Sequence, residues 1–340
     1  MRRLSVRDLA KLTPTDLSAE LFSRITHQRE LLERARAANS GAGPTVPPAL
    51  APAFAKVERG WNKAAAASSD ADALQEMEDG AAATVDEVRK LPTRGHPSDQ
   101  DLLRTTFEAV VGHRALVQAA AMARAEAPLL LPAKELGDLI SDSIDDARAF
   151  CREKHGDSPE ARVMRVTPSR TSSADATAAD DGVLLAPFVA FSLHELLKNA
   201  MGAHVRYAGA DKLDRLPPIA VRYGMIGGGG EAFVSVSDCG GGLHGGHTPE
   251  EALTFLHTTN PEREPTYTYS RNFGSPFEGL GVGLPLAALH AQYLGGAFHL
   301  HNIGGNAPGV HGAFTFDTSG NASEPEWSFL DVGRLKTNAS

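Results

Sequence analysis

The sequence predicts an α+β fold in which helices come first and a mixed sheet follows. Residues 1–128 carry helical periodicity without a strand pattern, and strand-like alternation appears only after them. These strands do not alternate regularly with helices, which argues against a doubly wound sheet. A chain of 340 residues is also longer than one hydrophobic core usually organises, so two domains are expected. We place them at 1–128 and 129–322, with a tail at 323–340.

Four amphipathic or alanine-rich helices are expected in the first domain. Leu17, Leu21 and Ile25 recur at helical spacing in the first of them. Apolar residues continue along one face of the last, which Ser98 or Asp99 is expected to cap. The expected helices span residues 15–38, 50–66, 70–91 and 99–126. Four helices with short connections predict a helical bundle.

The second domain is expected to contain both helices and strands. Helical periodicity marks three segments, the last of which is closed by Gly295 and Gly296. Alternating residues on both sides of the "GGGG" turn predict a hairpin within 217–238, and the polar stretch 167–182 predicts an exposed loop. The expected helices cover 135–156, 183–205 and 285–296, and the remaining expected strands cover 161–166, 297–303 and 311–318.

The bulk composition argues against several classes of protein. A net charge of −9 disfavours binding to nucleic acid, and no apolar run reaches the roughly 18 residues that a membrane span needs. Cys151 and Cys239 cannot form a disulfide framework, so a reducing compartment is indicated. The basic stretch "MRRLSVRDLAKL" fits either part of an organelle-targeting segment or a frayed leader.

The segment "HELLKNA" puts polar groups on one flank of an expected helix. Glu195 and Asn199 lie four residues apart, so their side chains share a face. An amide oxygen there can coordinate Mg²⁺, and a carboxylate one turn earlier can accept a proton. The alternative is an ordinary pair of Glu195 with Lys198 on a surface helix.

Two glycine-rich segments are candidate ligand sites. In "SVSDCGGGL" a strand ends at Asp238, whose carboxylate can accept an adenine amino group, while the glycines permit close approach. A plain glycine turn is the alternative, and Cys239 is either redox-sensitive or a small strand-end residue. In "FEGLGVGLPLAALHAQYLGG" the glycines precede a helix start, which favours phosphate. That spacing matches neither a Walker A loop nor a dinucleotide fingerprint.

In this order the segments resemble the GHKL superfamily of ATPases and kinases, and within it the mitochondrial 2-oxo acid dehydrogenase kinases. "ELLKNAMGA" is similar to the family's "ELxKNAMRA", and "GLGVGLPLAALHAQYLGG" to "GFGxGLPxSRxYAxYxGG". "HTTN" and "VVGHRALVQ" also resemble family segments. The resemblance is strongest over 185–205 and 233–300. It implies a regulatory and docking bundle, then a GHKL-type ATP-binding α/β sandwich whose mixed sheet carries helices on one face.

The resemblance also implies roles for individual residues. Glu195 would be the general base, Lys198 would lie beside the phosphates, and Asn199 would be the Mg²⁺ ligand. The stretch of about 243–278 would form a lid over ATP. The implied contacts to bound nucleotide are Asn199, Asp238, Gly240, Gly242, Thr258, Thr259, Gly279, Gly281, Gly283 and Leu284.

Four single positions depart from the family's pattern, and so does the segment "LPLAAL", which lacks the usual Ser-Arg. Phe191 stands where many pyruvate dehydrogenase kinases have a histidine, and Gly202 replaces an arginine. Cys239 stands where arginine is common, and His311 stands where a threonine is expected. ATP binding is expected to tolerate these changes better than full activity does.

The sequence therefore predicts an ATP-dependent protein serine kinase of the mitochondrial matrix. It would phosphorylate and inhibit the E1 component of a pyruvate or branched-chain 2-oxo acid dehydrogenase complex, with ATP and Mg²⁺ as cofactors. The resemblance implies the lipoyl domain of the E2 core and a second copy of the chain as partners. Two alternatives stay open: a GHKL histidine kinase, for which His113 is a poor phosphoacceptor candidate, and a catalytically weak nucleotide-binding scaffold on the complex.

Overall fold

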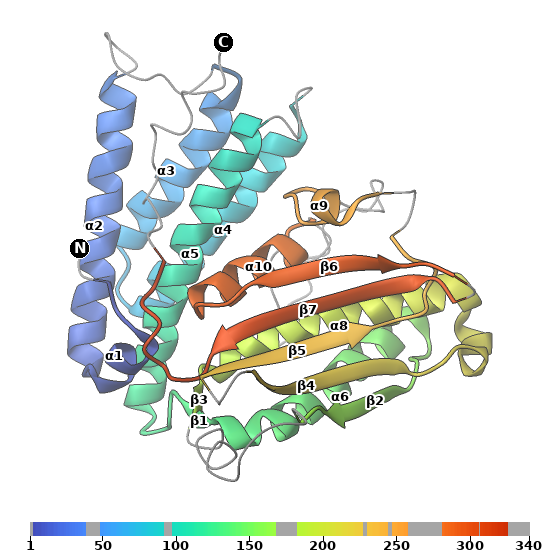
Figure 1. Ribbon diagram of the computed structural model, residues 1–340. Helices are drawn as coiled ribbons and strands as arrows, with labels where there is room; N and C mark the ends of the chain where they lie inside the picture. Colours follow the sequence, from blue (N-terminus) through green and yellow to red (C-terminus); the bar gives the residue numbers. More distant parts are fainter. Residues whose placement is uncertain are drawn as a thin grey trace.

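A computed structural model describes residues 3–38, 48–91, 97–167, 182–226, 230–243, 247–257, 281–305 and 307–325. Long helices stand together on one side, and a sheet backed by helices forms the other (Figure 1). Helices precede strands along the chain, so the predicted α+β class is confirmed. The two parts meet where α5 (Pro97–Arg124) packs against α10 (Gly283–Tyr293).

Four long helices of the described residues form the expected bundle. They are α2 (Pro14–Ala38), α3 (Ala51–Ala65), α4 (Asp70–Arg89) and α5, and the short η1 (Pro48–Leu50) leads into α3. Helices α2 and α4 each pack against both α3 and α5, and the faces between them are closed by buried side chains such as Trp61 and Phe107. The Ser69 hydroxyl accepts from the Asp72 N–H and caps α4.

Two sequence expectations about helix starts are wrong. Helix α5 begins at Pro97, so Ser98 and Asp99 lie inside its first turn instead of capping it. Proline fits that position, because its fixed φ suits a helix start and its missing N–H has no partner there anyway. The N-terminal stretch is not a frayed leader either. It forms α1 (Val6–Lys11), which begins with a capping box between Ser5 and Asp8, and Val6 and Leu9 are buried.

A five-stranded mixed sheet forms the second part, in the order β2-β4-β5-β7-β6. The strands are β2 (Ala161–Arg165), β4 (Ile219–Ile226), β5 (Glu231–Ser237), β6 (Phe298–Ile303) and β7 (Gly309–Asp317). Strand β2 runs parallel to β4, and the other neighbours are antiparallel. Alternate residues such as Val234 and Phe314 are buried, which fixes one face as the core face.

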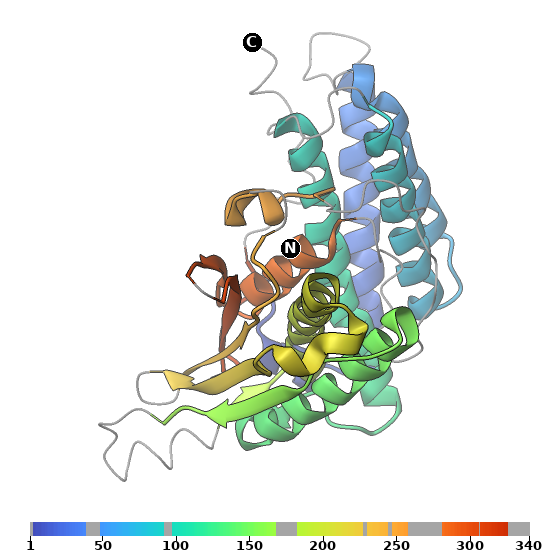
Figure 2. The ribbon, with the colours of Figure 1, turned by 90° about the vertical axis from the view of Figure 1, so that its right-hand side faces the viewer.

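Helices cover that one face of the sheet, as the resemblance predicted. They are α6 (Leu136–His155), α8 (Ala186–Ala208) and α10, and in Figure 1 the sheet lies in front of α6 and α8. The view turned by 90° separates the sheet from this helical layer (Figure 2). Helix α8 packs between α6 and α10 and touches β5 and β7, so its side chains reach the middle of the domain.

Several short elements have no counterpart in the sequence expectations. They are β1 (Leu131–Pro132), η2 (Ala133–Glu135), β3 (Val183–Leu184), η3 (Ala210–Arg215) and α9 (Pro249–Ala252). Strands β1 and β3 pair with each other as a separate two-stranded sheet. Helix α9 begins with a capping box between Thr248 and Glu251. Residues 168–181 of the loop expected at 167–182 lie outside the described residues.

Candidate active site

The carboxylate of Glu195 is pressed against the first residue of α10. Glu195 lies on α8 and is only 5% exposed. A Cβ added to Gly283 would sit 2.1 Å from Glu195 Oε2, so only glycine admits this approach. One turn earlier on α8, the Ser192 hydroxyl lies 3.2 Å from both the Ala287 carbonyl of α10 and the Phe188 carbonyl of its own helix, and so links the two helices. Two predicted site residues, 88 positions apart, are therefore neighbours.

Lys198 and Asn199 surround the same carboxylate. Lys198 Nζ lies 2.6 Å from Glu195 Oε1, and both side chains are largely buried. This pair is therefore not the solvated surface pair that was the alternative interpretation. Asn199 Nδ2 donates to the Glu195 backbone carbonyl at 2.8 Å. Because a carbonyl can only accept, the amide oxygen of the exposed Asn199 side chain is left for another partner.

Asp238 lies beyond the end of β5 in a tight backbone setting. Its Oδ1 accepts from the Gly240 N–H at 2.8 Å, and its own N–H donates to the Val310 carbonyl at 3.0 Å. Burial raises the pKa of the Asp238 carboxyl, while backbone hydrogen bonds from Gly240 and Val310 and the Arg206 charge oppose the rise. Asp238 is only 5% exposed, so its carboxylate lies in a largely water-free setting.

Helix α8 also positions the glycine turn after Asp238. His204 Nε2 accepts from the Cys239 N–H at 2.9 Å, and a Cβ on Gly240 would lie 2.6 Å from Ala203 Cβ. Because Nε2 accepts, His204 is the neutral tautomer, and burial lowers its pKa to about 4. Sequence analysis missed His204. An α-helix has about 3.6 residues per turn, so His204, nine residues after Glu195, lies on the opposite face of α8 and its spacing gave no signal.

Of the other residues predicted to contact nucleotide, some lie beside the site and others fall outside the described residues. Gly242 has φ +84°, and Asn302 Oδ1 accepts from the next N–H, that of Leu243. Gly281 has φ +73° and precedes α10, and Leu284 lies in the first turn of that helix. Thr258, Thr259 and Gly279 lie outside the described residues, as does most of the expected lid.

The four departures from the family pattern have different surroundings. Phe191 is a core residue whose ring stacks on buried His290 at 4.4 Å between centroids. His311 points to the open face of the sheet, where its Nδ1 lies 2.8 Å from Ser237 Oγ. Gly202 faces Arg206, whose Nη1 would be 3.1 Å from an added Cβ. Burial, and then the Asp238 charge, raise the pKa of the Cys239 thiol, which argues against a reactive thiolate.

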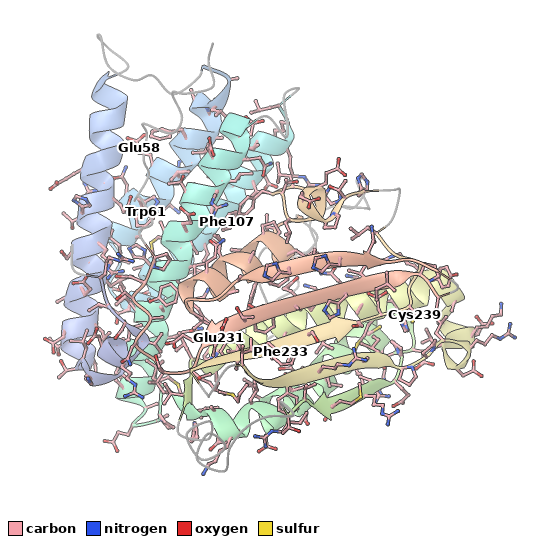
Figure 3. All side chains as sticks on the ribbon, viewed as in Figure 1. Glu58, Trp61, Phe107, Glu231, Phe233 and Cys239 are labelled. Carbon is pink, nitrogen blue, oxygen red and sulfur yellow. The ribbon has the colours of Figure 1, made fainter. Side chains whose placement is uncertain are left out.

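Figure 3 places Cys239 near the end of the sheet that is remote from the bundle, and Phe107 on α5. The site thus extends along α8, with Asp238 bound near the C-terminal part of the helix and Glu195 farther back beside α10. These residues fit a nucleotide: a buried carboxylate lies at one end, and a helix start with an amide oxygen nearby lies at the other. His299 and His301 are exposed strand residues, and no cluster of three or more His, Cys, Asp or Glu in the described ranges is arranged to hold a metal.

Comparison with curated sequences supports the resemblance to mitochondrial 2-oxo acid dehydrogenase kinases. Over 165 residues the chain is 28% identical to the mitochondrial pyruvate dehydrogenase (acetyl-transferring) kinase of Drosophila melanogaster, covering 48% of this chain and 37% of that one. The Schizosaccharomyces pombe kinase of the same name is 28% identical over 178 residues, 51% of this chain and 38% of its own. The Arabidopsis thaliana kinase of that name is 28% identical over 175 residues, which are 49% of this chain and 42% of that kinase.

These relatives confirm the resemblance seen in the motifs, and they are protein kinases by name. The chain spans well under half the length of the curated relatives it matches. No family model matches the sequence. Among the described residues, none of the helices combines the length and apolar character of a membrane span.

Two solved histidine kinases are distantly similar in structure. A mycobacterial sensor histidine kinase, MprB, gives a TM-score of 0.33 at 16% identity and covers 54% of this chain and 96% of its own. Full-length ShkA in complex with AMPPNP gives a TM-score of 0.37 at 16% identity, and the match covers 92% of this chain and 48% of ShkA. At these TM-scores the likeness carries no argument.

Proposed function

We propose that the chain is an ATP-dependent protein serine kinase that acts on the E1 component of a 2-oxo acid dehydrogenase complex in the mitochondrial matrix. The observation that carries this proposal is the buried Glu195 carboxylate, held against the start of α10 with Lys198 and Asn199 beside it. The relatives' names support a dehydrogenase complex as the target and the mitochondrion as the location.

In the proposed reaction, the oxygen of a serine hydroxyl attacks the γ-phosphorus of ATP, ADP leaves, and the hydroxyl proton passes to Glu195. The contact with Lys198 holds that carboxylate in a fixed orientation for accepting the proton. The Asp238 carboxylate accepts a hydrogen bond from the adenine amino group, and the N–H groups at the start of α10 face the phosphates. Asn199 would hold Mg²⁺, which would supply neutralisation of the phosphate charge.

We extend the proposal to regulation and assembly. Phosphorylation of E1 would inhibit the complex, either the pyruvate or the branched-chain type. Residues 1–128 would dock on a lipoyl domain of the E2 core, residues 129–322 would carry the kinase site, and the active form would be a homodimer. The tail at 323–340 would begin within the folded structure, because Glu324 is bound by Arg24.

A histidine kinase is the competing function, and the structure disfavours its acceptor candidate. His113 is 1% exposed, its Nδ1 lies 2.6 Å from the Ala109 carbonyl, and its ring meets Trp61 edge-on at 4.9 Å. An incoming phosphate cannot reach an imidazole in that position without opening the bundle.

The test is incubation of the purified chain with γ-labelled ATP, Mg²⁺ and each of the two E1 proteins. We expect acid-stable label on an E1 serine, lost in Glu195→Gln although that variant still binds ATP. Asn199→Ala should lose both Mg²⁺-dependent binding and transfer. Acid-labile label on the chain itself would instead support a histidine kinase. Nucleotide binding without any transfer would support a scaffold.

A further inference from the structure

Helix α5 of the bundle contacts the backbone that leads away from α9. The Phe255 N–H donates to Gln100 Oε1 at 2.8 Å, and Gln100 Nε2 donates to the Phe255 carbonyl at 2.9 Å. One side-chain amide therefore satisfies both backbone groups of a residue 155 positions away, as a neighbouring strand would. The Phe255 ring stacks on Phe107, two turns along α5, with centroids 5.3 Å apart and planes 7° from parallel.

The next residue, Leu256, connects this segment to the residues that precede α10. Leu256 has φ +67°, a left-handed conformation that non-glycine residues adopt only when their surroundings impose it. In that conformation its N–H donates to the Gly281 carbonyl at 2.9 Å. The approach is tight, because a Cβ on Gly281 would lie 2.6 Å from the His257 carbonyl oxygen. The two short segments, 255–257 and 281–283, therefore hold each other.

The second of these segments ends at the Glu195 carboxylate. Gly281 is two residues before Gly283, whose backbone meets Glu195 Oε2. A continuous path of contacts thus runs from Gln100 to Phe255, from Leu256 to Gly281, and from Gly283 to Glu195. A shift of the 255–257 segment would move the first turn of α10 relative to α8, because packed groups transmit displacement.

We propose that Gln100 and Phe107 are positioning residues for the kinase site. They hold residues 255–256 in place, and through Gly281 they set where α10 begins relative to Glu195. Neither residue touches substrate. The inference rests on the proposed function and deepens it: the first domain supplies part of the framework of the active site in the second.

The test compares Gln100→Met, which keeps length without hydrogen bonds, with Gln100→Glu, which keeps the acceptor and loses the donor. Arg104→Met is the matched control. Arg104 lies one turn further along α5 and also reaches the second part, with its Nη2 3.3 Å from Gln292 Oε1 of α10, but it has no bond to Phe255 among those the structure gives. All variants are first checked for native circular dichroism.

Amide hydrogen exchange in the nucleotide-free proteins is the first measurement. We expect exchange at Leu256 to be roughly tenfold faster in Gln100→Met, an intermediate increase in Gln100→Glu, and none in Arg104→Met. The second measurement is calorimetry with Mg-ATP and turnover on E1. We expect Gln100→Met to raise the Kd for Mg-ATP about tenfold and to lower kcat about tenfold. A loss of global stability alone would change neither quantity at a temperature where the variant stays folded.

The outcomes separate the two proposals. A wild-type chain that binds no Mg-ATP overturns the proposed function and the inference with it. A wild-type chain that binds Mg-ATP, beside a folded Gln100→Met variant with wild-type exchange at Leu256 and wild-type Kd and kcat, overturns the inference alone. Equal effects of Arg104→Met and Gln100→Met also overturn it, because the loss would then come from loosening the whole contact between the two parts.

Discussion

At the scale of single residues, the polar groups of the candidate site were predictable where they lie close together in the sequence. Glu195 and Asn199 share a helix face by spacing, and the structure finds them on α8 with Lys198 between them. His204 and Gln100 could not be found in this way. Their partners lie 35 and 155 residues away, so only the folded chain brings them together.

Gly283→Ala is the sharpest residue-scale prediction. The new methyl group would overlap the buried Glu195 carboxylate, which lies 2.1 Å from its position, so either α10 or Glu195 must move. We expect a loss of about 1–3 kcal/mol in unfolding free energy and at least a tenfold fall in phosphoryl transfer. Chemical denaturation and a transfer assay measure the two effects.

Gly230→Ala is the matched control for that substitution, because nothing lies within 4 Å of the position of its Cβ. It should leave both quantities unchanged. If Gly283→Ala were as stable and as active as Gly230→Ala, the contact between Glu195 and the start of α10 would not exist in solution.

At the scale of elements, long periodic segments were predicted to within a few residues and short ones were not predicted at all. The helices predicted at 70–91 and 135–156 correspond to α4 and α6, because a dozen or more residues carry the helical periodicity in each. Helix α9 has four residues and β1 and β3 have two each, which is too few for any period to emerge. Their structure comes from capping and tertiary contact.

Three helices carry a buried neutral histidine, and this predicts loss of stability in acid. Burial lowers the pKa of His113 on α5 and of His290 on α10 to about 3 and that of His204 on α8 to about 4. In the unfolded chain each titrates near 6.5, so between these values the unfolded state binds more protons. The stability they contribute is therefore complete above pH 6.5 and is lost as the pH falls towards 4.

Each histidine adds up to about 1.4 kcal/mol per pH unit to the dependence of the unfolding free energy on pH. Denaturation at pH 7.5, 6.5, 5.5 and 4.5 measures this slope. A His290→Leu variant removes one titrating group, so its slope should be shallower than that of the wild type. Equal slopes in the two proteins would contradict the assignment of His290 as buried and neutral.

At the scale of the whole molecule, the division into a helical part and a sheet part was predictable from composition and periodicity. The connection between the parts was not. Residues after β7 return to the bundle, as the last described segment does in Figure 1, and Glu324 is bound there by the Arg24 guanidinium at 2.7 and 2.8 Å. The Glu324 N–H also donates to the Leu4 carbonyl at 3.0 Å. A lone glutamate near a chain end carries no sequence signal for such a role.

Glu324→Gln should therefore destabilise the protein strongly. The side chain is 9% exposed and Arg24 is 3% exposed, so removing the charge deprives a buried guanidinium of the carboxylate that lies 2.7 Å from its Nη2. We expect a loss of about 3 kcal/mol in unfolding free energy, measured by denaturant titration.

Glu160→Gln serves as the comparison, because Glu160 pairs with Arg148 at 2.7 Å but is 71% exposed. That change should cost about 0–1 kcal/mol. Similar losses for the two variants would mean that Glu324 is not buried against Arg24 in solution.

The contact between Arg24 and Glu324 also bears on how the molecule is made. The two residues are 300 positions apart, so a nascent chain exposes helix α2 long before the ribosome has synthesised its carboxylate partner. Until then Arg24 lacks the carboxylate that lies 2.7 Å from its Nη2 in the folded protein. We therefore expect helix α2 to reach its final packing only after the segment around Glu324 has been synthesised.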